Sequence, residues 1–341
     1  MSSWRYAAKR LAWSIFALVG LSIVIFLLSR VIPGDPARMA LGPRAPESVV
    51  MELREQMHLD EPLFVQYGYW LWGALHLDFG MSLVTMRPVL KDIQDFLPAT
   101  MELVVLAAFL EISLGVSLGV LSAMFNRRWV DNLIRLIAYL GIVNPSFVFA
   151  VIFLLLFGYL WPILPAVGRV TMDTGIPRIT GLITVDSLLI GNLDLFWDAV
   201  KHLILPALAL AMNGSAQLAR ITRSSMVDNL SRDYVAMATA QGISQMKIMF
   251  KYLLRPSLIP SVSIMGLQFA TLFSNAFLVE LIFNWPGLSR YGVTAMLNKD
   301  LNAVTAVVLT VGLIFVLANI VTDIAVAALD PRIRLGAGRE A

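Results

Sequence analysis

The 341-residue chain is 58% hydrophobic and only 14% charged, and its formal net charge is +3. A soluble domain carries about 25% charged residues because it needs a hydrated surface, so this composition excludes an ordinary water-soluble globule and indicates a membrane protein. The absence of cysteine excludes disulfides, zinc–thiolate sites, iron–sulfur clusters and thiol nucleophiles. Basic residues gather in short segments between apolar runs, which is typical of membrane topology rather than of nucleic-acid binding.

Six apolar segments are long enough to cross a bilayer, which takes about 20 residues. They lie at residues 11–28, 99–125, 133–160, 203–221, 261–283 and 304–329. The first segment follows Arg5, Lys9 and Arg10 as the core of a secretory signal would. It is of spanning length and no small-residue cleavage site follows it, so we expect an uncleaved span. Asn144 and Pro145 interrupt the third segment, where a kink is expected because proline removes a backbone donor.

The charges predict which side each loop faces. The tails and the loops at residues 126–132 and 222–259 are rich in arginine and lysine, whereas residues 31–97 carry an excess of acid. The positive-inside rule therefore places both termini in the cytoplasm. The predicted parts are a tip and first span (1–30), an extracytoplasmic segment (31–97), a five-helix core (98–329) that includes the cytoplasmic loop 222–259, and a cytoplasmic tail (330–341).

The extracytoplasmic segment is expected to be helical rather than disordered. Apolar residues between 49 and 57 have the spacing of one helical face, and Pro62 is suited to open a second helix. Aromatic residues gather in this second helix as in an interfacial belt: Phe64, Tyr67, Tyr69, Trp70 and Trp72. We expect a small helical cap on the outer membrane surface, and a further outer loop over residues 161–202.

The loop at 222–259 is too long for a bare connector, since helix–helix links usually take about 2–8 residues. Ser231 is predicted to cap a short helix with Asp233 in its first turn, which ends at Gly242. A second helix over residues 245–254 follows, and Pro256 is expected to push Arg255 out of helical geometry. Small side chains on the first helix suit close contact with another protein, but a surface helix that only connects two spans fits the same pattern.

The loop has a small-residue triplet at 236–238, then Gly242, and ends in Pro260. This pattern resembles the cytoplasmic loop of ABC-importer permease subunits. Over nearly its whole length the chain is similar to the dipeptide/oligopeptide/nickel subfamily. The matching stretches are Ile-Pro-Gly-Asp-Pro at 32–36, Asp-Phe-Gly-Met-Ser at 78–82, Pro-Ala-Thr-Met-Glu-Leu at 98–103, Thr-Arg-Ser-Ser-Met at 222–226, Gly-Leu-Gln at 266–268, Ile-Phe-Asn-Trp-Pro-Gly-Leu at 282–288 and Asp-Pro-Arg-Ile-Arg at 330–334.

The resemblance implies an all-α membrane protein with six transmembrane helices, of the type I ABC importer permease kind, in a bacterial inner membrane. It implies a second homologous permease, two ATPase subunits that bind ATP and magnesium, and an extracytoplasmic solute-binding protein. The loop helix would then be the coupling helix that contacts an ATPase. The coupling residues are Tyr234, Ala236, Met237, Ala238, Gly242 and Pro260. Peptides are the expected solutes, with a nickel chelate, glutathione or an opine-like compound as alternatives.

Other motifs have simpler interpretations. Gly115 and Gly119 belong to a G-x-S-x-G pattern, but inside an apolar span they favour close helix packing over a nucleophile elbow. No phosphate-binding G-x-x-x-x-G-K-[ST] loop occurs, so we expect no ATPase activity and no bound cofactor. His58, His76 and His202 are predicted to be hydrated or interfacial, since they lack metal-ligand spacing.

Polar residues within the spans are costly and are therefore candidates for function. The candidate translocation residues are Asn144, Ser146, Gln217, Gln268, Asn275 and Glu280. Hydrogen bonding between helices explains such residues equally well, although the family resemblance places the fifth span beside the path. Two other classes of protein fit less well. A secondary transporter would show paired broken helices, and an intramembrane hydrolase would need a base that no span supplies.

Overall fold

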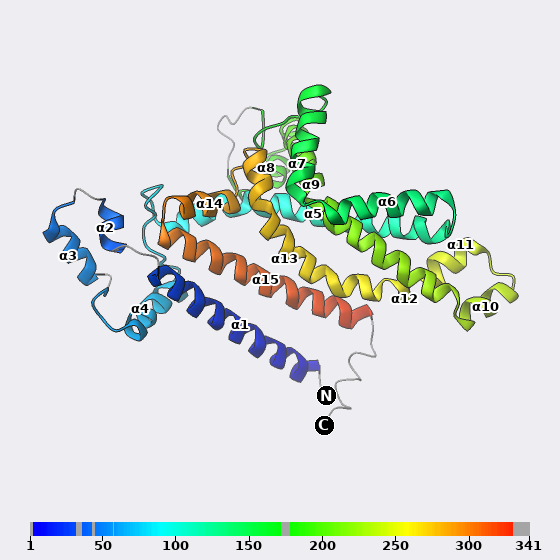
Figure 1. Ribbon diagram of the computed structural model, residues 1–341, viewed down its shortest axis with the longest axis horizontal. Coiled ribbons are helices and arrows are strands. Elements are labelled where there is room, and N and C mark those ends of the chain that lie inside the picture. Colours follow the sequence, from blue (N-terminus) through cyan, green and yellow to red (C-terminus); the bar gives the residue numbers. More distant parts are fainter. Residues whose placement is uncertain (1–2, 32–35, 43–44, 57, 172–177, 330–341) are drawn as a thin grey trace. The chain divides into compact units, whose positions relative to one another are not determined.

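The computed structural model describes residues 3–31, 36–42, 45–56, 58–171 and 178–329, and this part of the chain is helical without strands. The signature residues at 32–35 and 330–334 lie outside it. The long helices are α1 (Ser3–Val31), α5 (Val89–Met124), α6 (Trp129–Val143), α9 (Leu193–Leu230), α13 (Ile259–Ile282) and α15 (Leu301–Leu329). The shorter helices are α2 (Pro36–Leu41), α3 (Glu47–Gln56), α4 (Leu63–Leu75), α7 (Ser146–Phe153), α8 (Ile183–Leu189), α10 (Asp233–Ala240), α11 (Gln245–Lys247), α12 (Leu254–Ser257) and α14 (Leu288–Leu297), with π-helical turns η1 (Leu154–Leu160) and η2 (Ile248–Leu253) (Figure 1).

The predicted membrane fold is confirmed. Within the described residues, five helices are long and apolar enough to cross a bilayer, and the α6–α7 pair continued by η1 makes a sixth candidate. Two predicted boundaries are wrong: α5 and α9 each begin about ten residues before the apolar run, at Val89 and Leu193. Both helices extend in the N-terminal direction beyond the apolar run, because adding one residue to an existing helix costs less than starting a new one. The expected outer loop therefore ends at Asn192 and contains the short helix α8.

The predicted kink is present and is sharper than a proline bend in a continuous helix. The axes of α6 and α7–η1 differ by 106°, with Asn144 and Pro145 between them in extended conformation. Proline at position 145 cannot donate to the carbonyl of Gly141. The side-chain amide of Asn213 on α9 donates to that carbonyl and to that of Ile142, at 3.2 Å each. Breaking a membrane helix is tolerated where a neighbouring side chain supplies the missing partner.

The chain divides into two compact units, and each is described by itself. Unit 2 comprises Ser2–Ala99 and Pro286–Val316. The two helices predicted for residues 31–97 of this unit are present as α3 and α4. Tyr67 on α4 shares a 2.8 Å hydrogen bond with Ser22 on α1, and the ring of Phe26 packs against Tyr67 and Trp70. Helix α4 is therefore held against the first span, whereas Phe64 and Trp72 point away and are exposed.

Two buried carboxylates organise the rest of unit 2. Asp300 accepts a 2.6 Å hydrogen bond from Ser82 and a 2.7 Å bond from the backbone N–H of Leu83, so the signature at 78–82 is fixed to the start of α15. Asp92 accepts from Arg87 at 2.5 Å and from the Tyr291 hydroxyl at 3.0 Å. Burial raises the pKa of Tyr291, and the adjacent Asp92 raises it further. The apolar core of the unit surrounds these carboxylates between α5, α14 and α15.

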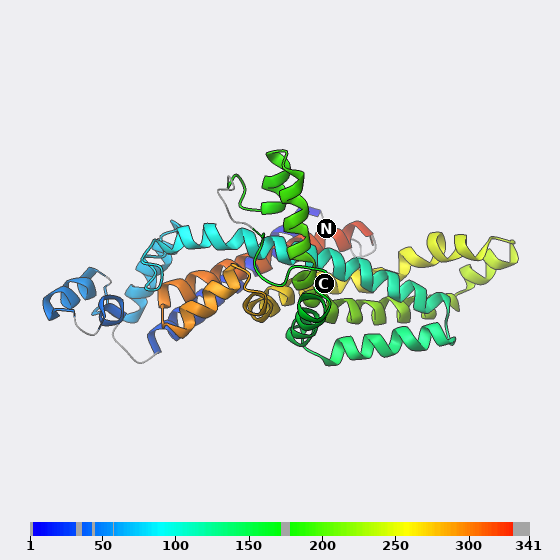
Figure 2. The ribbon, with the colours of Figure 1, turned by 90° about the horizontal axis from the view of Figure 1, so that it is seen from above.

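Unit 1 comprises Thr100–Trp285 and Leu317–Ala341. Helix α9 is its central element and packs against α6, α7, α8, α12 and α13 (Figures 1 and 2). Glycines at the contacts bring the helices close together. An added Cβ at Gly119 on α5 would lie 2.6 Å from Thr222 Cβ, and at Gly115 it would lie 2.7 Å from Leu218 Cβ. The small-residue packing predicted for these two glycines is confirmed, and their serine lies within a continuous helix rather than at an elbow.

Two of the signature stretches meet at one end of unit 1. Thr100 donates a 2.5 Å hydrogen bond to Glu280, which is fully buried. Glu102 forms a 2.6 Å ion pair with Arg169, whose guanidinium also lies over the ring of Trp285. Glu102 and Trp285, one from each stretch, therefore hold Arg169 of the segment 161–171 against the helices.

A small residue at position 119 is expected to be required for the α5–α9 contact. Gly119→Val should destabilise the protein by about 1–3 kcal/mol, the usual cost of overpacking, because Thr222 cannot withdraw without moving α9. Gly20→Val is the matched control, since Gly20 on α1 has no atom within 4 Å of an added Cβ. Thermal unfolding in detergent, followed by fluorescence, measures the difference. Equal melting temperatures for the two variants would contradict the close packing.

Candidate functional site

The predicted coupling loop contains a short helix with the expected position and end. Helix α10 spans Asp233–Ala240, with Asp233 in its first turn. Together with α11 it lies at the tip of the segment that connects α9 with α12 (Figures 1 and 2). Helix α9 itself continues to Leu230, so the loop is shorter than the predicted 222–259.

The C-terminus of α10 has a glycine-dependent cap. Gly242 has φ +75°, in the left-handed region that favours glycine. The backbone N–H of Gly242 donates to the carbonyl of Thr239 at 3.0 Å, and that of Ile243 donates to Ala238 at 3.2 Å. This pair of bonds is a Schellman motif, which satisfies carbonyls that the helix leaves without partners. The predicted stop at Gly242 is confirmed, and it fixes the direction in which the chain leaves α10.

The two faces of α10 differ. Val235 and Ala238 are buried in a core cluster with Val120, Ala123, Met226, Ile248 and Leu253. Ala236 and Met237 are exposed, with Met237 at 65%, and Tyr234 is 40% exposed. The expectation that Ala238 contacts another protein is therefore wrong: its spacing from Val235 places it on the inner face. The surface left for a partner consists of Tyr234, Ala236, Met237, Ala240 and Gln241.

Two local expectations for this loop are also wrong, and a third is confirmed. Ser231 does not cap α10, since its hydroxyl donates to the Asp228 carbonyl and Arg232 occupies the cap position. The second predicted helix, 245–254, is present: it begins as α11 at Gln245 and continues through the π-helical turn η2, which begins at Ile248. The other wrong expectation concerns Arg255, which stays helical within α12 although Pro256 follows it; α12 continues directly from η2. Pro260 lies in the first turn of α13 and is exposed.

An ion pair that the sequence analysis did not predict lies beside this loop. Asp131 at the start of α6 accepts from Arg223 Nε at 2.6 Å and from Nη2 at 2.7 Å. Its carboxylate also accepts from the Ser122 hydroxyl and from the backbone N–H of Arg127. Arg223 Nη2 donates in addition to the side-chain oxygen of Asn126. The carboxylate is fully buried, and all its partners come from α5, α9 or the α5–α6 turn. This bidentate pair fixes α6 and α9 relative to each other, three residues before Met226 of α9, which belongs to the core cluster beneath α10.

The candidate translocation residues do not form one cluster. Gln268 is buried, and its amide lies 3.3 Å from Gln217 Oε1, so these two meet between α13 and α9. Asn144 donates to the carbonyl of Leu140 at the kink, and Asn275 is exposed. The nearby Ser146 hydroxyl is buried and has no hydrogen-bond partner among the residues that the structure describes. Glu280 bonds to Thr100 as described above. Interhelical or local bonding therefore accounts for Gln217, Gln268, Asn144 and Glu280.

The histidines are placed differently from one another. His76 is exposed and His58 stacks on Tyr69. His202 is buried on α9 and bonds to the Asp198 carbonyl at 2.9 Å, so the prediction of a hydrated residue is wrong there. It became buried because α9 begins before the apolar run. Among the described residues no group of three His, Cys, Asp or Glu side chains could hold a metal ion.

The Glu102–Arg169 ion pair, which anchors residues 161–171, could be predicted from the sequence only in part. Glu102 was recognisable as a carboxylate within an apolar span, but Arg169 lies 67 residues away in an irregular loop and has no periodic signal. Asp186 on α8 closes the same loop. Burial raises the pKa of Asp186, but hydrogen bonds from the Thr180 hydroxyl and from three backbone N–H groups at 179–181 outweigh burial and hold the pKa below its ordinary value.

Comparison with known proteins decides the family. Residues 115–335 match the model for the binding-protein-dependent transport system inner membrane component, and residues 3–104 match its N-terminal companion. The chain belongs to this family of inner-membrane transport permeases. A "Probable D,D-dipeptide transport system permease protein" of Escherichia coli (strain K12) is 38% identical over 99% of this chain and 100% of its own length.

Two other relatives cover the permease almost completely. The dipeptide transport system permease protein of Alkalihalophilus pseudofirmus is 38% identical over 96% of this chain and 99% of its own length. A glutathione transport system permease protein of Escherichia coli (strain K12) is 35% identical over 96% of this chain and 98% of its own length. The family description makes the chain a membrane component of a transport system rather than an enzyme.

Removing the charge of one partner in the Asp131–Arg223 pair is expected to lower the free energy of unfolding. Arg223→Gln leaves a buried carboxylate without its cation and should destabilise the protein by about 3 kcal/mol. Asp131→Asn removes the opposite charge. The double variant should lose less than the sum of the two singles, since it leaves no uncompensated charge. A double-mutant cycle from thermal unfolding measures the coupling, and strict additivity would show that the pair contributes nothing.

Proposed function

We propose that this permease is the membrane subunit of an ATP-driven ABC importer for peptides or peptide-like solutes. The observation that supports this proposal best is the full-length similarity to permeases named for dipeptide transport. The glutathione permease at 35% identity supports a peptide-like solute as well, since glutathione is itself a tripeptide. A nickel chelate or an opine-like compound is the alternative solute within the same family, and a secondary transporter is a remote one.

The proposed assembly contains partners that the chain itself does not provide. A second permease would complete the path, a solute-binding protein would deliver the solute from outside, and two ATPase subunits would bind ATP and magnesium. This chain would hold no cofactor and hydrolyse no ATP. The basic loops would face the cytoplasm, with both termini inside a bacterial inner membrane.

In the proposed mechanism, α10 transmits the motion of the ATPases to the helices. The exposed Met237 and Ala236 would contact an ATPase groove, while Val235 and Ala238 pass the displacement to α5 and α9 through the core cluster. The Schellman end at Gly242 and the Asp131–Arg223 pair keep this region stiff. Alternating access then requires that the ATPases bind the two permease states with different affinity.

The coupling role predicts two separable phenotypes. Met237→Glu places a charge on the exposed face and should abolish uptake by weakening the ATPase contact. Gly242→Val should impair uptake as well. A positive φ costs a non-glycine residue about 1–2 kcal/mol, so the substitution should change the direction in which the chain leaves α10. Uptake of labelled dipeptide into vesicles and co-purification of the ATPase subunits are measured together. Ala238→Glu would bury a carboxylate in the core, so it tests folding rather than contact.

Matched controls exist for both changes. Met296→Glu alters an equally exposed methionine on α14, and Gly191→Val strains a glycine with φ +73° that has open space around it. Both controls should retain uptake. If Met237→Glu and Gly242→Val both show wild-type uptake and full co-purification of the ATPase subunits, α10 only connects two spans.

The orientation is tested independently of transport. A reporter inserted within residues 126–129 should report the cytoplasm, because the basic turn there follows the positive-inside rule. A reporter within residues 46–60 should report the outside. Alkaline phosphatase and green fluorescent protein fusions give opposite signals on the two sides. A cytoplasmic signal from the 46–60 insertion would overturn the proposed topology.

A further inference from the structure

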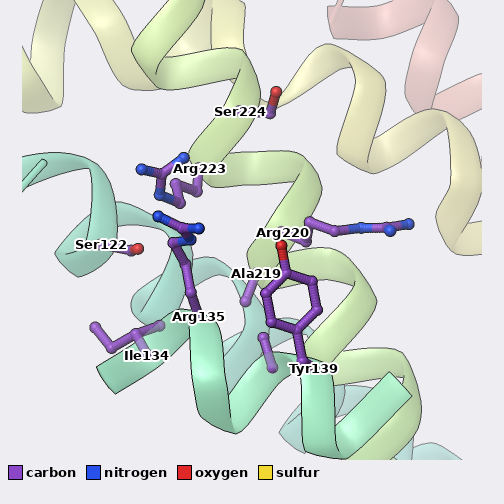
Figure 3. A pocket seen from close by; sticks show the side chains of 9 residues that line it. Ser122, Ile134, Arg135, Tyr139, Ala219, Arg220, Arg223 and Ser224 are labelled. Carbon is purple, nitrogen blue, oxygen red and sulfur yellow. The ribbon is translucent and has the colours of Figure 1, made fainter. Parts of the chain in front are cut away.

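A basic pocket lies between α6 and α9, next to the Asp131–Arg223 pair (Figure 3). Helix α6 contributes Arg135 and Tyr139, one turn apart on one face, and α9 contributes Arg220 and Arg223 three residues apart. The remaining lining residues are Ser122, Ile134, Ala138, Ala219 and Ser224. Figure 3 shows Arg135 beside Arg223, while Arg220 extends in another direction beyond Tyr139.

The charge of this pocket is not neutralised by the described part of the chain. Asp131 bonds to Nε and Nη2 of Arg223, and no bond to Nη1 is present. Arg135 and Arg220 have no hydrogen bond or ion pair with any described residue, and both are exposed. The lining contains no carboxylate. The pocket therefore presents about two net positive charges together with the free hydroxyls of Tyr139 and Ser224.

The surroundings of the pocket are apolar on α6. Leu133, Leu136, Ile137 and Leu140 are exposed on the same helix, as expected for a surface in contact with lipid chains. Trp129 is 74% exposed at the start of α6, and tryptophan is enriched at the membrane–water boundary. Arg135 lies about 9 Å further along the helix axis, within the distance over which an arginine reaches lipid headgroups.

We propose that this pocket binds the phosphate diester of an anionic phospholipid from the cytoplasmic leaflet. Arg135 and Nη1 of Arg223 would donate to the phosphate oxygens, and Arg220 would contact the headgroup from the other side of Tyr139. Basic pockets between transmembrane helices on the cytoplasmic side suit such headgroups, since that leaflet has a negative surface potential. The assignment of the leaflet rests on the orientation given under the proposed function, whereas binding itself does not depend on transport.

A bound lipid would have a specific consequence. Its phosphate would bridge α6 and α9 beside the ion pair that already joins them, and α9 carries Met226 of the core cluster beneath α10. The lipid would thus stiffen the same contact from the membrane side. The stability of unit 1 would therefore depend on the anionic lipid content of the membrane.

The experiment is a titration of the purified full-length chain in detergent, read by native mass spectrometry. The probes are phosphatidylglycerol, zwitterionic phosphatidylcholine and inorganic phosphate. Phosphatidylglycerol should bind, and Arg135→Gln or Arg220→Gln should each weaken it roughly five-fold, as expected for one basic residue near an anionic headgroup. Arg135→Lys, which keeps the charge, should retain most of the affinity. Phosphatidylcholine should show no dependence on either variant.

Arg128→Gln is the matched control. Arg128 is exposed in the adjacent turn and is not among the lining residues, so the same change in charge should leave binding near the wild-type level. Equal binding of both lipids, an equal loss in Arg128→Gln, or displacement by inorganic phosphate would each overturn the proposal. Loss of phosphatidylglycerol when the second permease is added would assign the pocket to a subunit interface instead. A failure of uptake with this binding pattern intact would contradict only the proposed function.

Discussion

The close approach of helices to α9 is the constraint on which unit 1 depends. In a bilayer, apolar side chains gain little by leaving lipid for protein, so helices associate through close packing and hydrogen bonds. Gly119 on α5 and Gly141 on α6 each place their helix against a small side chain of α9. Gly266 on α13 makes a similarly close contact with Thr322 on α15. Because these contacts are short, small displacements of one helix are passed to its neighbours rather than absorbed.

Polar groups in this interior complete the packing rather than form a charged binding site. Asn213 satisfies the carbonyls exposed by the break at Pro145, and Thr222 bonds to Ser261 at 2.9 Å between α9 and α13. Such bonds cost little once made, but each would leave an unsatisfied group in a membrane if its helix moved far.

The sequence predicted the spans, the kink and the end of α10 because each depends on local chemistry. Apolar runs of spanning length need no tertiary information, and Pro145 and Gly242 act on their own backbone. The errors arise where tertiary contacts decide. Ala238 is small, as a docking residue would be, but its position relative to Val235 on the helix makes it part of the core. The pairs Asp131–Arg223 and Glu102–Arg169 join residues 92 and 67 positions apart, and no spacing rule connects them.

The same distinction explains why the surface of α10 could be located only with the structure. A helix of eight residues has little stability of its own, so it must be held by its neighbours to act on a partner. Burial of Val235 and Ala238 provides that support and thereby selects which side chains remain outside. Tyr234, Ala236 and Met237 are left exposed as a consequence. An exposed methionine is flexible and polarisable and fits an irregular apolar groove. The inner face of α10 therefore determines, through packing alone, the surface that it offers to another protein.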